Sequence, residues 1–278
     1  MSNPNHFVLT LWTNEAGLAR RADAAGVDRI GLDLETFKKA ERQPKTLATW
    51  ISTHREEHLP RLRESIGRGK LFCRVNPIAD PDCKAQIDRL VGYGVEVMML
   101  PMFTTPDEVA RFVGYVNGRA ECVILLENCE AADRVEQIVK VPGISDVHVG
   151  INDLTLSLCK RTGEMNKNRF GVLASDLMLR IGRAVLGEGI RFGVGGIGRA
   201  LDSGQKISSD LIYAQYPRLG ATAALIARSF FGHDPEGMDV TAEVKRARGR
   251  LAWWAARPAP ELEAARRQLA EATGGASW

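Results

Sequence analysis

The sequence has few aromatic residues, few cysteines, little net charge and no long apolar run. Only 6% of its 278 residues are aromatic, so a stacking surface for single-stranded nucleic acid is not expected. The 37 basic and 34 acidic residues are interspersed and leave a net charge of +3, which differs from the one-sided basic surface of nucleic-acid-binding proteins. The composition, 45% hydrophobic and 26% charged, indicates a globular protein.

The cysteines and the first residues carry no sign of an oxidising or membrane environment. The five cysteines are scattered and form no C-x-x-C pair, which argues against a disulfide framework and a zinc ribbon. Residues 1–6 lack the basic and apolar regions of a secretory signal, and no apolar run approaches the ~20 residues that span a bilayer. We therefore expect a cytoplasmic protein with neither a membrane nor a nucleic-acid partner.

Apolar segments of strand length alternate with segments of helical period along most of the chain. The predicted strands are 7–12, 28–34, 71–76, 95–100, 121–126, 146–151, 190–195 and 222–228. Their near-continuous apolarity is typical of parallel strands covered on both faces. Eight β–α units of about 35 residues predict a (β/α)8 TIM barrel, and an open doubly wound sheet is the alternative. We expect the barrel over residues 1–238 and a helical extension over 239–278, packed on the barrel or on a neighbouring subunit.

Polar residues recur where the predicted strands end, and in a barrel these ends converge on one mouth. The strand-end residues are Asp33, Glu35, Arg74, Asn76, Glu127, Asn152, Asp153 and Arg228. We expect Asp33 and Glu35 to point to opposite sides of their strand. Glu127 and Asp153 lie one β–α unit apart and would provide part of an octahedral site for Mg²⁺ or Mn²⁺. Alternatively, each pairs with a nearby Lys or Arg.

Arg74 and a glycine-rich segment are candidate anion-binding elements. The Arg74 guanidinium could bind an acidic substrate or stabilise an enolate, or it could pair with Glu35 or Glu127. The segment 193–198 matches G-x-G-x-x-G but follows the seventh strand, whereas a dinucleotide fold has this motif after the first. We predict a loop here whose backbone N–H groups, at Gly195 and Gly196, receive an anion with help from Arg228. Close packing of the glycines is the alternative.

A second motif, H-x-x-E-H, spans residues 54–58 and matches an inverted zinc-protease pattern. It lies in a strongly charged stretch with no further ligand nearby. We therefore interpret this motif as a solvated helix face.

Five short segments in order resemble the HpcH/HpaI aldolase and citrate lyase beta-subunit family. They are residues 30–35, 74–77, 98–102, 126–127 and 149–154, and the resemblance covers roughly residues 7–231. It implies a (β/α)8 barrel with a divalent metal, usually Mg²⁺ or Mn²⁺, although other divalent metals are possible. It also implies formation or cleavage of a C–C bond through the enolate of pyruvate or of a CoA thioester.

The resemblance assigns roles to individual residues of this chain. It implies that Glu127 and Asp153 bind the metal and that Arg74 contacts the keto-acid oxygen. The backbone from Gly150 through Asn152 to Asp153 would meet the substrate carboxylate.

Two positions depart from the family pattern. Thr36 stands where pyruvate aldolases carry a histidine base and citrate lyase-type members an acidic residue, and Leu125 replaces a glutamine that aids carboxylate binding. The general base is therefore open among Glu35, a metal-bound hydroxide and a histidine of residues 36–70.

We expect a metal-dependent C–C lyase or aldolase that acts on a 2-oxo acid of the pyruvate or oxaloacetate type, with an unknown acceptor. The resemblance also implies a homo-oligomer. One alternative is a CoA-thioester lyase or thioesterase of the citrate lyase type, and another is a barrel that binds metal and anion without catalysis.

Overall fold

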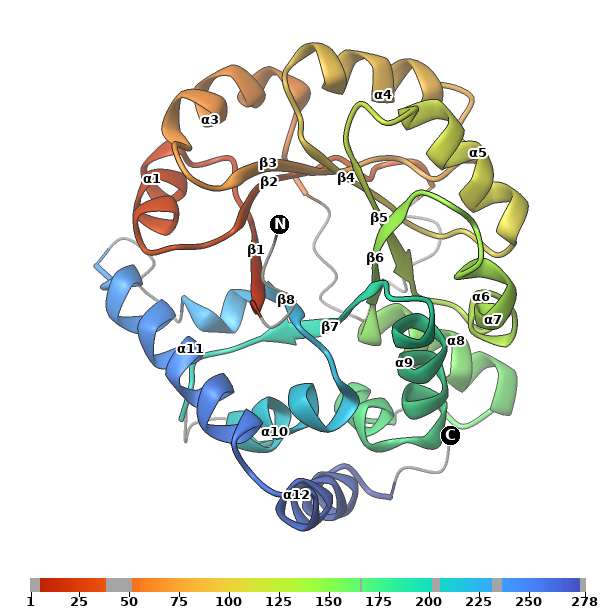
Figure 1. Cartoon of the computed structure of the whole chain (residues 1–278), viewed down its shortest axis with the longest axis vertical. Helices are drawn as coiled ribbons and strands as arrows, with labels where there is room; N and C mark the ends of the chain where they lie inside the picture. Colours follow the sequence, from red (N-terminus) through yellow and green to blue (C-terminus); the bar gives the residue numbers. More distant parts are fainter. Residues whose placement is uncertain (1–5, 39–51, 166, 202–205, 232–236, 276–278) are drawn as a thin grey trace.

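The computed structural model describes residues 6–38, 52–165, 167–201, 206–231 and 237–275. Eight parallel strands form a closed barrel in sequence order, because β1 pairs with both β2 and β8 (Figure 1). The strands are β1 (Val8–Trp12), β2 (Arg29–Asp33), β3 (Lys70–Arg74), β4 (Val97–Leu100), β5 (Glu121–Leu126), β6 (Ile144–Val149), β7 (Arg191–Ile197) and β8 (Ala223–Ile226). This confirms the predicted (β/α)8 barrel and excludes the open sheet.

Helices surround the barrel on the outside (Figure 1). The α-helices are α1 (Ala16–Ala24), α3 (Leu59–Ser65), α4 (Cys83–Gly92), α5 (Pro106–Val116), α6 (Cys129–Asp133), α7 (Val135–Ile138), α8 (Ile151–Thr162), α9 (Asp176–Gly187), α10 (Ser209–Leu219), α11 (Val240–Ala255) and α12 (Ala259–Ala272). The described residues also form the 3-10 helices η1 (Glu56–His58), η2 (Arg169–Ala174) and η3 (Arg228–Phe230).

The alternation of side chains along each strand divides the core into two layers. Outward-facing residues such as Ile30 and Leu32 pack against the helices, in one large apolar cluster. A smaller cluster fills the barrel itself and consists of Phe72, Val97, Met99, Val123 and Leu125, with Trp12 packed against it. This apolar cluster therefore separates the polar groups at one end of the barrel from those at the other.

The C-terminal helices pack on the barrel. Helix α11 contacts α1 and α10, and α12 contacts α10 and η2. Trp254 is buried, and its indole N–H donates to Asp210 of α10 at 3.0 Å, whereas Trp253 is 39% exposed. An additional contact of residues 239–278 with a neighbouring subunit stays a prediction.

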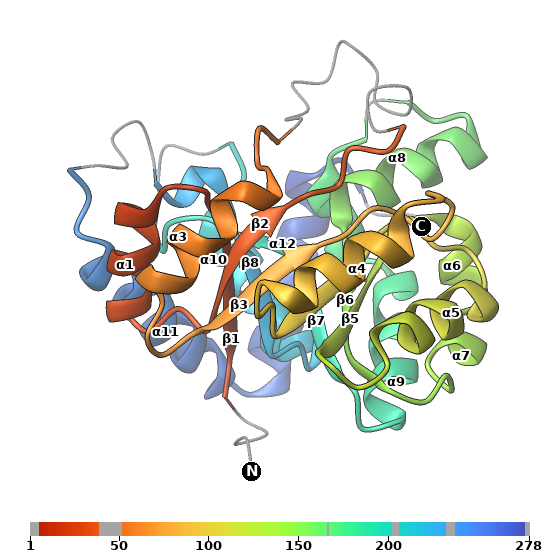
Figure 2. The same ribbon diagram turned by 90° about the horizontal axis from the view of Figure 1, so that it is seen from above.

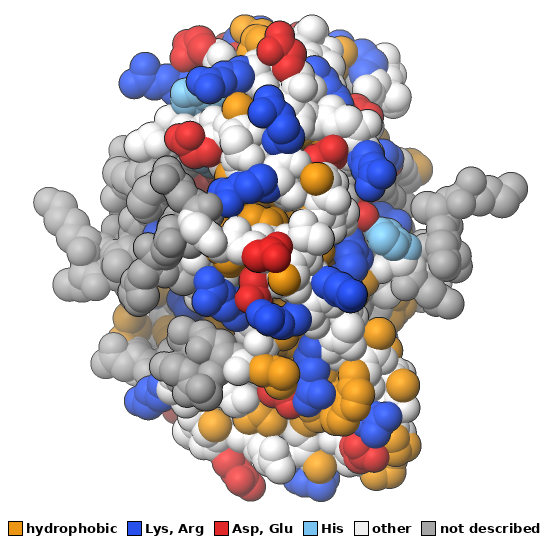
Figure 3. All heavy atoms as spheres, turned by 90° about the vertical axis from the view of Figure 1, so that its left-hand side faces the viewer, with side chains coloured by type: hydrophobic (Ala, Val, Ile, Leu, Met, Phe, Trp, Pro, Cys, Tyr) orange, Lys and Arg blue, Asp and Glu red, His pale blue; other side chains and the backbone are white. Residues whose placement is uncertain are grey.

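The distribution of charge on the surface and the length of the helices bear on the expectations from composition. On the face shown in Figure 3, basic and acidic side chains are both scattered among neutral ones. No helix in the described ranges combines the length and apolarity needed to cross a membrane. Figure 2 shows the strands rising from the end of the barrel near the N-terminus towards the end where β2 leads into its following loop and α8 begins.

Candidate active site

Arg74, at the end of β3, is held by two carboxylates, those of Asp33 at the end of β2 and of Glu35 two residues later. Its Nε and Nη2 donate to the two carboxylate oxygens of Asp33 at 2.8 and 2.7 Å, and Nη2 lies 3.2 Å from Oε2 of Glu35. The expectation that Asp33 and Glu35 point to opposite sides is wrong, because residues two apart in an extended chain share a face. The ion pair with Glu35 that we considered for Arg74 is present.

The environment of Arg74 favours its charged form. Burial by itself lowers the pKa of Arg74, but the negative charges of Asp33 and Glu35 outweigh burial and hold the pKa above its usual value. The guanidinium also lies over the Trp12 ring, 4.7 Å from its centre. Arg74 is thus a fixed cation at the mouth of the barrel.

Glu127 follows β5 and is only 2% exposed. Its Oε1 accepts the backbone N–H of Met102 at 3.0 Å, and Met102 has φ +56°, an uncommon value for a residue with a side chain. A Cβ on Gly150 would lie 3.1 Å from Oε2 of Glu127, so the missing side chain leaves room for the carboxylate. A strained backbone and a close glycine therefore hold Glu127 in place.

The charges around Glu127 disfavour its ionised form. Burial raises the pKa of Glu127 well above its usual value, and the negative charges of Glu35 and Asp153 raise it further. The Arg74 charge and the Met102 N–H act in the opposite direction and are outweighed. Within the described residues, neither Glu127 nor Asp153 forms an ion pair with Lys or Arg, so the structure does not support the alternative pairing.

The charges around Glu127 suit a divalent cation. Among the residues that the structure describes, the negative charges of Glu35 and Asp153 outweigh the Arg74 guanidinium in their effect on Glu127. The described part of the chain holds no group of three or more His, Cys, Asp or Glu arranged around a metal position. Glu127 and Asp153 would therefore supply two ligands and leave the remaining positions to water and substrate, as Mg²⁺ commonly requires. The donor set fits the expected ion.

The N-terminus of α8 provides hydrogen-bond donors next to Asp153. Gly150 is the N-cap of this 12-residue helix, Asn152 is exposed, and Asp153 lies half-buried in the first turn. The first backbone N–H groups of a helix have no partner within it, and the helix dipole adds partial positive charge there. This terminus could receive a carboxylate, as expected for residues 150–153.

The glycine-rich segment differs from the predicted loop, because residues 193–197 belong to β7. The register with β8 shifts between Gly193 and Gly196, and Gly195 has φ +50°. A Cβ on Gly196 would lie 3.3 Å from Cβ of Ala227, which agrees with the close-packing alternative. Arg228 is exposed in η3, directly after β8.

His148 was missed by the sequence reasoning and lies inside the barrel, where it is 4% exposed. Its Nε2 is 2.9 Å from the carbonyl oxygen of Gly195, and its Nδ1 would be 2.4 Å from a Cβ on Gly193. The signal was available in the sequence, since Asp146 and His148 alternate with valines and therefore share the inward face.

The histidines after β2 are engaged with the backbone. His54 Nδ1 accepts the N–H of Asp33 at 3.0 Å, and His58 Nδ1 accepts the N–H of Arg55 at 3.1 Å. The two histidines of the H-x-x-E-H motif thus support local structure, and η1 is a short helical turn. Thr36 is exposed, and its N–H is held by Asn76 Oδ1 at 2.8 Å.

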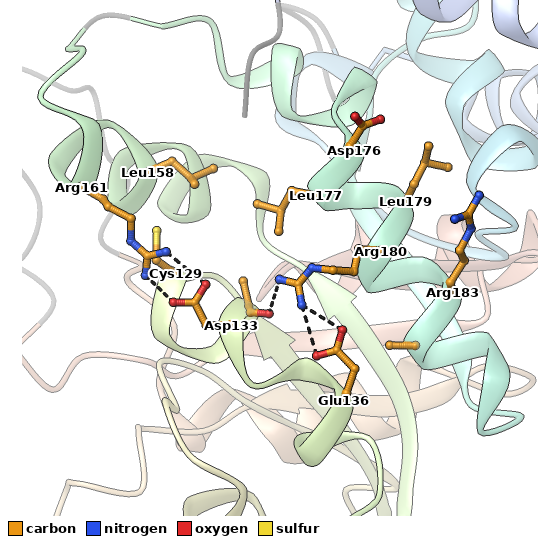
Figure 4. A pocket seen from close by; sticks show the side chains of 12 residues that line it. Cys129, Asp133, Glu136, Leu158, Arg161, Asp176, Leu177, Leu179, Arg180 and Arg183 are labelled. Atoms are coloured by element: carbon orange, nitrogen blue, oxygen red, sulfur yellow. Dashed lines mark hydrogen bonds and ion pairs between the residues drawn. The ribbon is translucent and has the colours of Figure 1, made fainter.

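A groove of about 920 Å³ lies on the outside of the barrel, between α6, α7, α8 and α9 (Figure 4). Two of its arginines are paired across it, Arg161 with Asp133 at 2.8 Å and Arg180 with Glu136 at 2.9 Å. None of the predicted site residues lines this groove. The candidate site is therefore the mouth of the barrel.

A family model described as HpcH/HpaI aldolase/citrate lyase matches residues 7–170. The chain belongs to this family. A search of curated proteins found no match.

Several solved structures share the fold at low sequence identity. A family protein from Burkholderia cenocepacia J2315 is 16% identical, with a TM-score of 0.60 over 90% of this chain and 95% of that chain. CitE from Mycobacterium tuberculosis in complex with magnesium and pyruvate is 15% identical, with a TM-score of 0.61 over 98% and 99%. The same protein with magnesium, acetoacetate and coenzyme A is 16% identical, with a TM-score of 0.59 over 97% and 88%.

Proposed function

We propose that this chain is a divalent-metal-dependent lyase or aldolase that acts through the enolate of a 2-oxo acid of the pyruvate or oxaloacetate type. The observation that carries the proposal is the buried Glu127, which faces the charges of Glu35 and Asp153 and, among the described residues, the guanidinium of Arg74. Such an arrangement is costly without a further cation. Family membership and the complex of CitE with magnesium and pyruvate support the same chemistry.

Glu127 and Asp153 would hold the metal, Mg²⁺ or Mn²⁺. The ion would supply a Lewis acid for the keto oxygen of the substrate. Arg74 would contact the same oxygen through Nη1, the guanidinium nitrogen that bonds neither Asp33 nor Glu35. The carboxylate of the 2-oxo acid would be received by the N–H groups at the start of α8, beside the apolar Leu125, which provides no amide at this place.

Glu35 is our choice for the base that accepts the methyl proton. It is only 2% exposed, and its carboxylate lies beside Arg74, the residue that would contact the keto oxygen. His54 is less suited, because its Nδ1 already accepts the Asp33 N–H. Gly195, Gly196 and Arg228 would contact the acceptor, whose identity the mouth does not specify.

The test is proton–deuterium exchange of the pyruvate methyl group in D₂O, followed by NMR with Mg²⁺ or Mn²⁺ and then with EDTA. We expect exchange that requires the metal and is lost in Glu127→Gln. Glu130→Gln, an exposed change on α6 three residues away, is the matched control and should exchange like the unmodified chain. Exchange that persists in EDTA, or in Glu127→Gln at the unmodified rate, would contradict the proposal.

The CoA-thioester alternative is supported by the complex of CitE with coenzyme A. Calorimetric metal binding without pyruvate exchange, together with turnover of malyl-CoA or citramalyl-CoA, would favour it. Metal binding without turnover of either substrate class would favour the non-catalytic barrel. The homo-oligomer and the cytoplasmic location also stay proposals, and light scattering after gel filtration tests the first.

A further inference from the structure

The end of the barrel opposite the mouth is closed by ion pairs that cross its interior. Arg29, at the start of β2, donates to Asp146 of β6 and, at 3.1 Å, to Glu121 of β5. Lys70 of β3 also pairs with Glu121, and Arg191 of β7 pairs with Asp146 at 3.1 Å. The side chains of Arg29 and Asp146 are only 6% and 2% exposed, so these charges form a buried floor.

A hollow of about 1030 Å³ lies against this floor, at the N-terminal ends of the strands. Both signs of charge line it. The charged residues are Arg29, Arg68, Lys70 and Arg191, with Asp28, Glu121 and Asp146 as carboxylates, and His6 lies at the same hollow.

One of the three carboxylates is neutralised from outside the hollow. Asp28 Oδ2 accepts from Arg248 of α11 at 2.8 Å, and Asp28 Oδ1 lies 2.5 Å from His6 Nε2. Arg248 does not line the hollow. Four cationic side chains therefore face two remaining carboxylates, Glu121 and Asp146, and the hollow carries an excess of positive charge.

Several donors around the hollow are still available to a ligand. The Arg68 guanidinium forms no hydrogen bond or ion pair with a described residue and acts on Asp23 only through its charge, since backbone N–H groups bind that carboxylate. Arg191 uses only Nη1 for Asp146, and its side chain is 22% exposed. Lys70 is 47% exposed. A guanidinium with free N–H groups binds oxyanions through paired hydrogen bonds.

We propose that this hollow is a binding site for a small tetrahedral oxyanion, inorganic phosphate or a phosphomonoester, held by Arg68, Arg191 and Lys70. The site lies at the end of the barrel opposite the residues that bind metal and substrate. The N-terminal face of such barrels governs stability, so the anion stabilises the fold without taking part in the reaction. A ligand that binds only the folded chain raises its unfolding temperature with concentration.

The experiment titrates the full chain with inorganic phosphate, at constant ionic strength maintained with sodium chloride, by thermal unfolding and by calorimetry. We expect a saturable rise in the unfolding temperature. Arg68→Gln should raise the dissociation constant at least about tenfold, because a charge-assisted pair of hydrogen bonds is lost. Arg191→Gln should do the same. Arg68 forms no ion pair with any residue of the described ranges, so its variant remains informative if Arg191→Gln fails to fold.

Arg183→Gln is the matched control, because Arg183 is an exposed arginine that lines the outer groove of Figure 4 instead. It should bind phosphate like the unmodified chain. A rise in unfolding temperature that chloride alone reproduces, or that Arg68→Gln and Arg183→Gln share unchanged, would overturn the proposal and indicate screening. A phosphomonoester that binds at least as tightly as phosphate and depends on Arg68 would extend the site to organic phosphates.

Discussion

Replacing His148 by glutamine should make the stability of the protein less sensitive to acid. The imidazole is buried, and Nε2 must carry a proton, because the Gly195 carbonyl can only accept. Nδ1 would lie 2.4 Å from a Cβ built on Gly193, and it has no hydrogen-bond acceptor among the described residues. Burial lowers the pKa of His148 to about 4, although the Gly195 carbonyl and the Asp146 charge partly oppose the shift.

The sign and the size of the effect follow from linkage. Below about pH 6.5 His148 is protonated in the unfolded chain, whereas in the folded chain it stays neutral until the pH falls to about 4. The contribution of neutral His148 is therefore complete above pH 6.5 and is lost as the pH falls towards 4. With these two pKa values the free energy of unfolding falls by about 2 kcal/mol between pH 8 and pH 5. At a pH well below both pKa values the loss reaches about 3.4 kcal/mol.

The assay is urea unfolding of the unmodified chain and of His148→Gln at pH 8 and pH 5. Glutamine does not titrate and can still donate to the Gly195 carbonyl, so the variant should lose about 2 kcal/mol less than the unmodified chain on acidification. All other titrating groups cancel in this comparison. His58→Gln, on η1 outside the barrel, is the matched control. Equal acid sensitivity in the unmodified chain and His148→Gln would refute the assignment of a neutral, buried imidazole.

Three further substitutions test the site. Gly193→Ala places a Cβ 2.4 Å from Nδ1 of His148 and should destabilise the fold by about 1–3 kcal/mol in urea unfolding. Gly150→Ala brings a Cβ to 3.1 Å from Oε2 of Glu127 and should weaken Mg²⁺ or Mn²⁺ binding at least about tenfold in calorimetry, because displacement by tenths of an ångström disturbs a metal ligand. Arg74→Lys should lower the pyruvate exchange rate by about 10–100-fold with the fold intact, since one ammonium cannot replace the paired bonds to Asp33.

Gly17→Ala is the control for both glycine variants, because nothing lies within 4 Å of a Cβ built there. Alanine favours a helix over glycine by about 1 kcal/mol, so this change within α1 should be neutral or slightly stabilising. Loss of stability and metal affinity in Gly17→Ala as well would assign those losses to glycine replacement in general. For Arg74→Lys, an exchange rate equal to that of the unmodified chain would remove Arg74 from the reaction.

The fold could be predicted because each strand can be recognised from its own residues. Strand apolarity and the count of β–α units depend on single segments, and the strands lie within a few residues of the predicted ranges. The convergence of strand ends then brings Glu35, Arg74 and Glu127 together without any knowledge of loops. This reasoning fails where a residue depends on a distant partner. Gly195 belongs to an irregular part of β7 whose carbonyl contacts His148, and its neighbours in the sequence suggest a loop instead.

The positive φ of Met102 is a second feature that could not be predicted from the sequence. Nothing in Pro101-Met102-Phe103 indicates a positive φ, because glycine and asparagine usually signal that conformation. In this conformation the Met102 N–H donates to the carboxylate of Glu127, which follows a different strand. Likewise, the inward ion pair of Arg29 with Asp146 joins residues more than a hundred positions apart. Such contacts form only when the barrel closes, so no pattern of neighbouring residues in the sequence predicts them.

The position of the base can be settled by Glu35→Gln. Thr36 is exposed with its backbone held by Asn76, whereas Glu35 is buried against Arg74. Our proposal therefore places the proton acceptor one residue before the position that the resemblance assigns to it. General-base catalysis contributes about 10²–10⁴-fold, so Glu35→Gln should lower the pyruvate exchange rate by at least about a hundredfold.

Metal binding separates this role of Glu35 from the role of Glu127. Glutamine retains the shape of Glu35, and Glu127 and Asp153 remain, so calorimetry should still detect metal in Glu35→Gln and lose it in Glu127→Gln. If Glu35→Gln keeps both metal binding and an exchange rate within about threefold of the unmodified chain, the proton goes elsewhere, and a metal-bound hydroxide becomes the remaining candidate. If Glu35→Gln loses the metal as well, Glu35 belongs to the metal site and the two carboxylates of our ligand set become three.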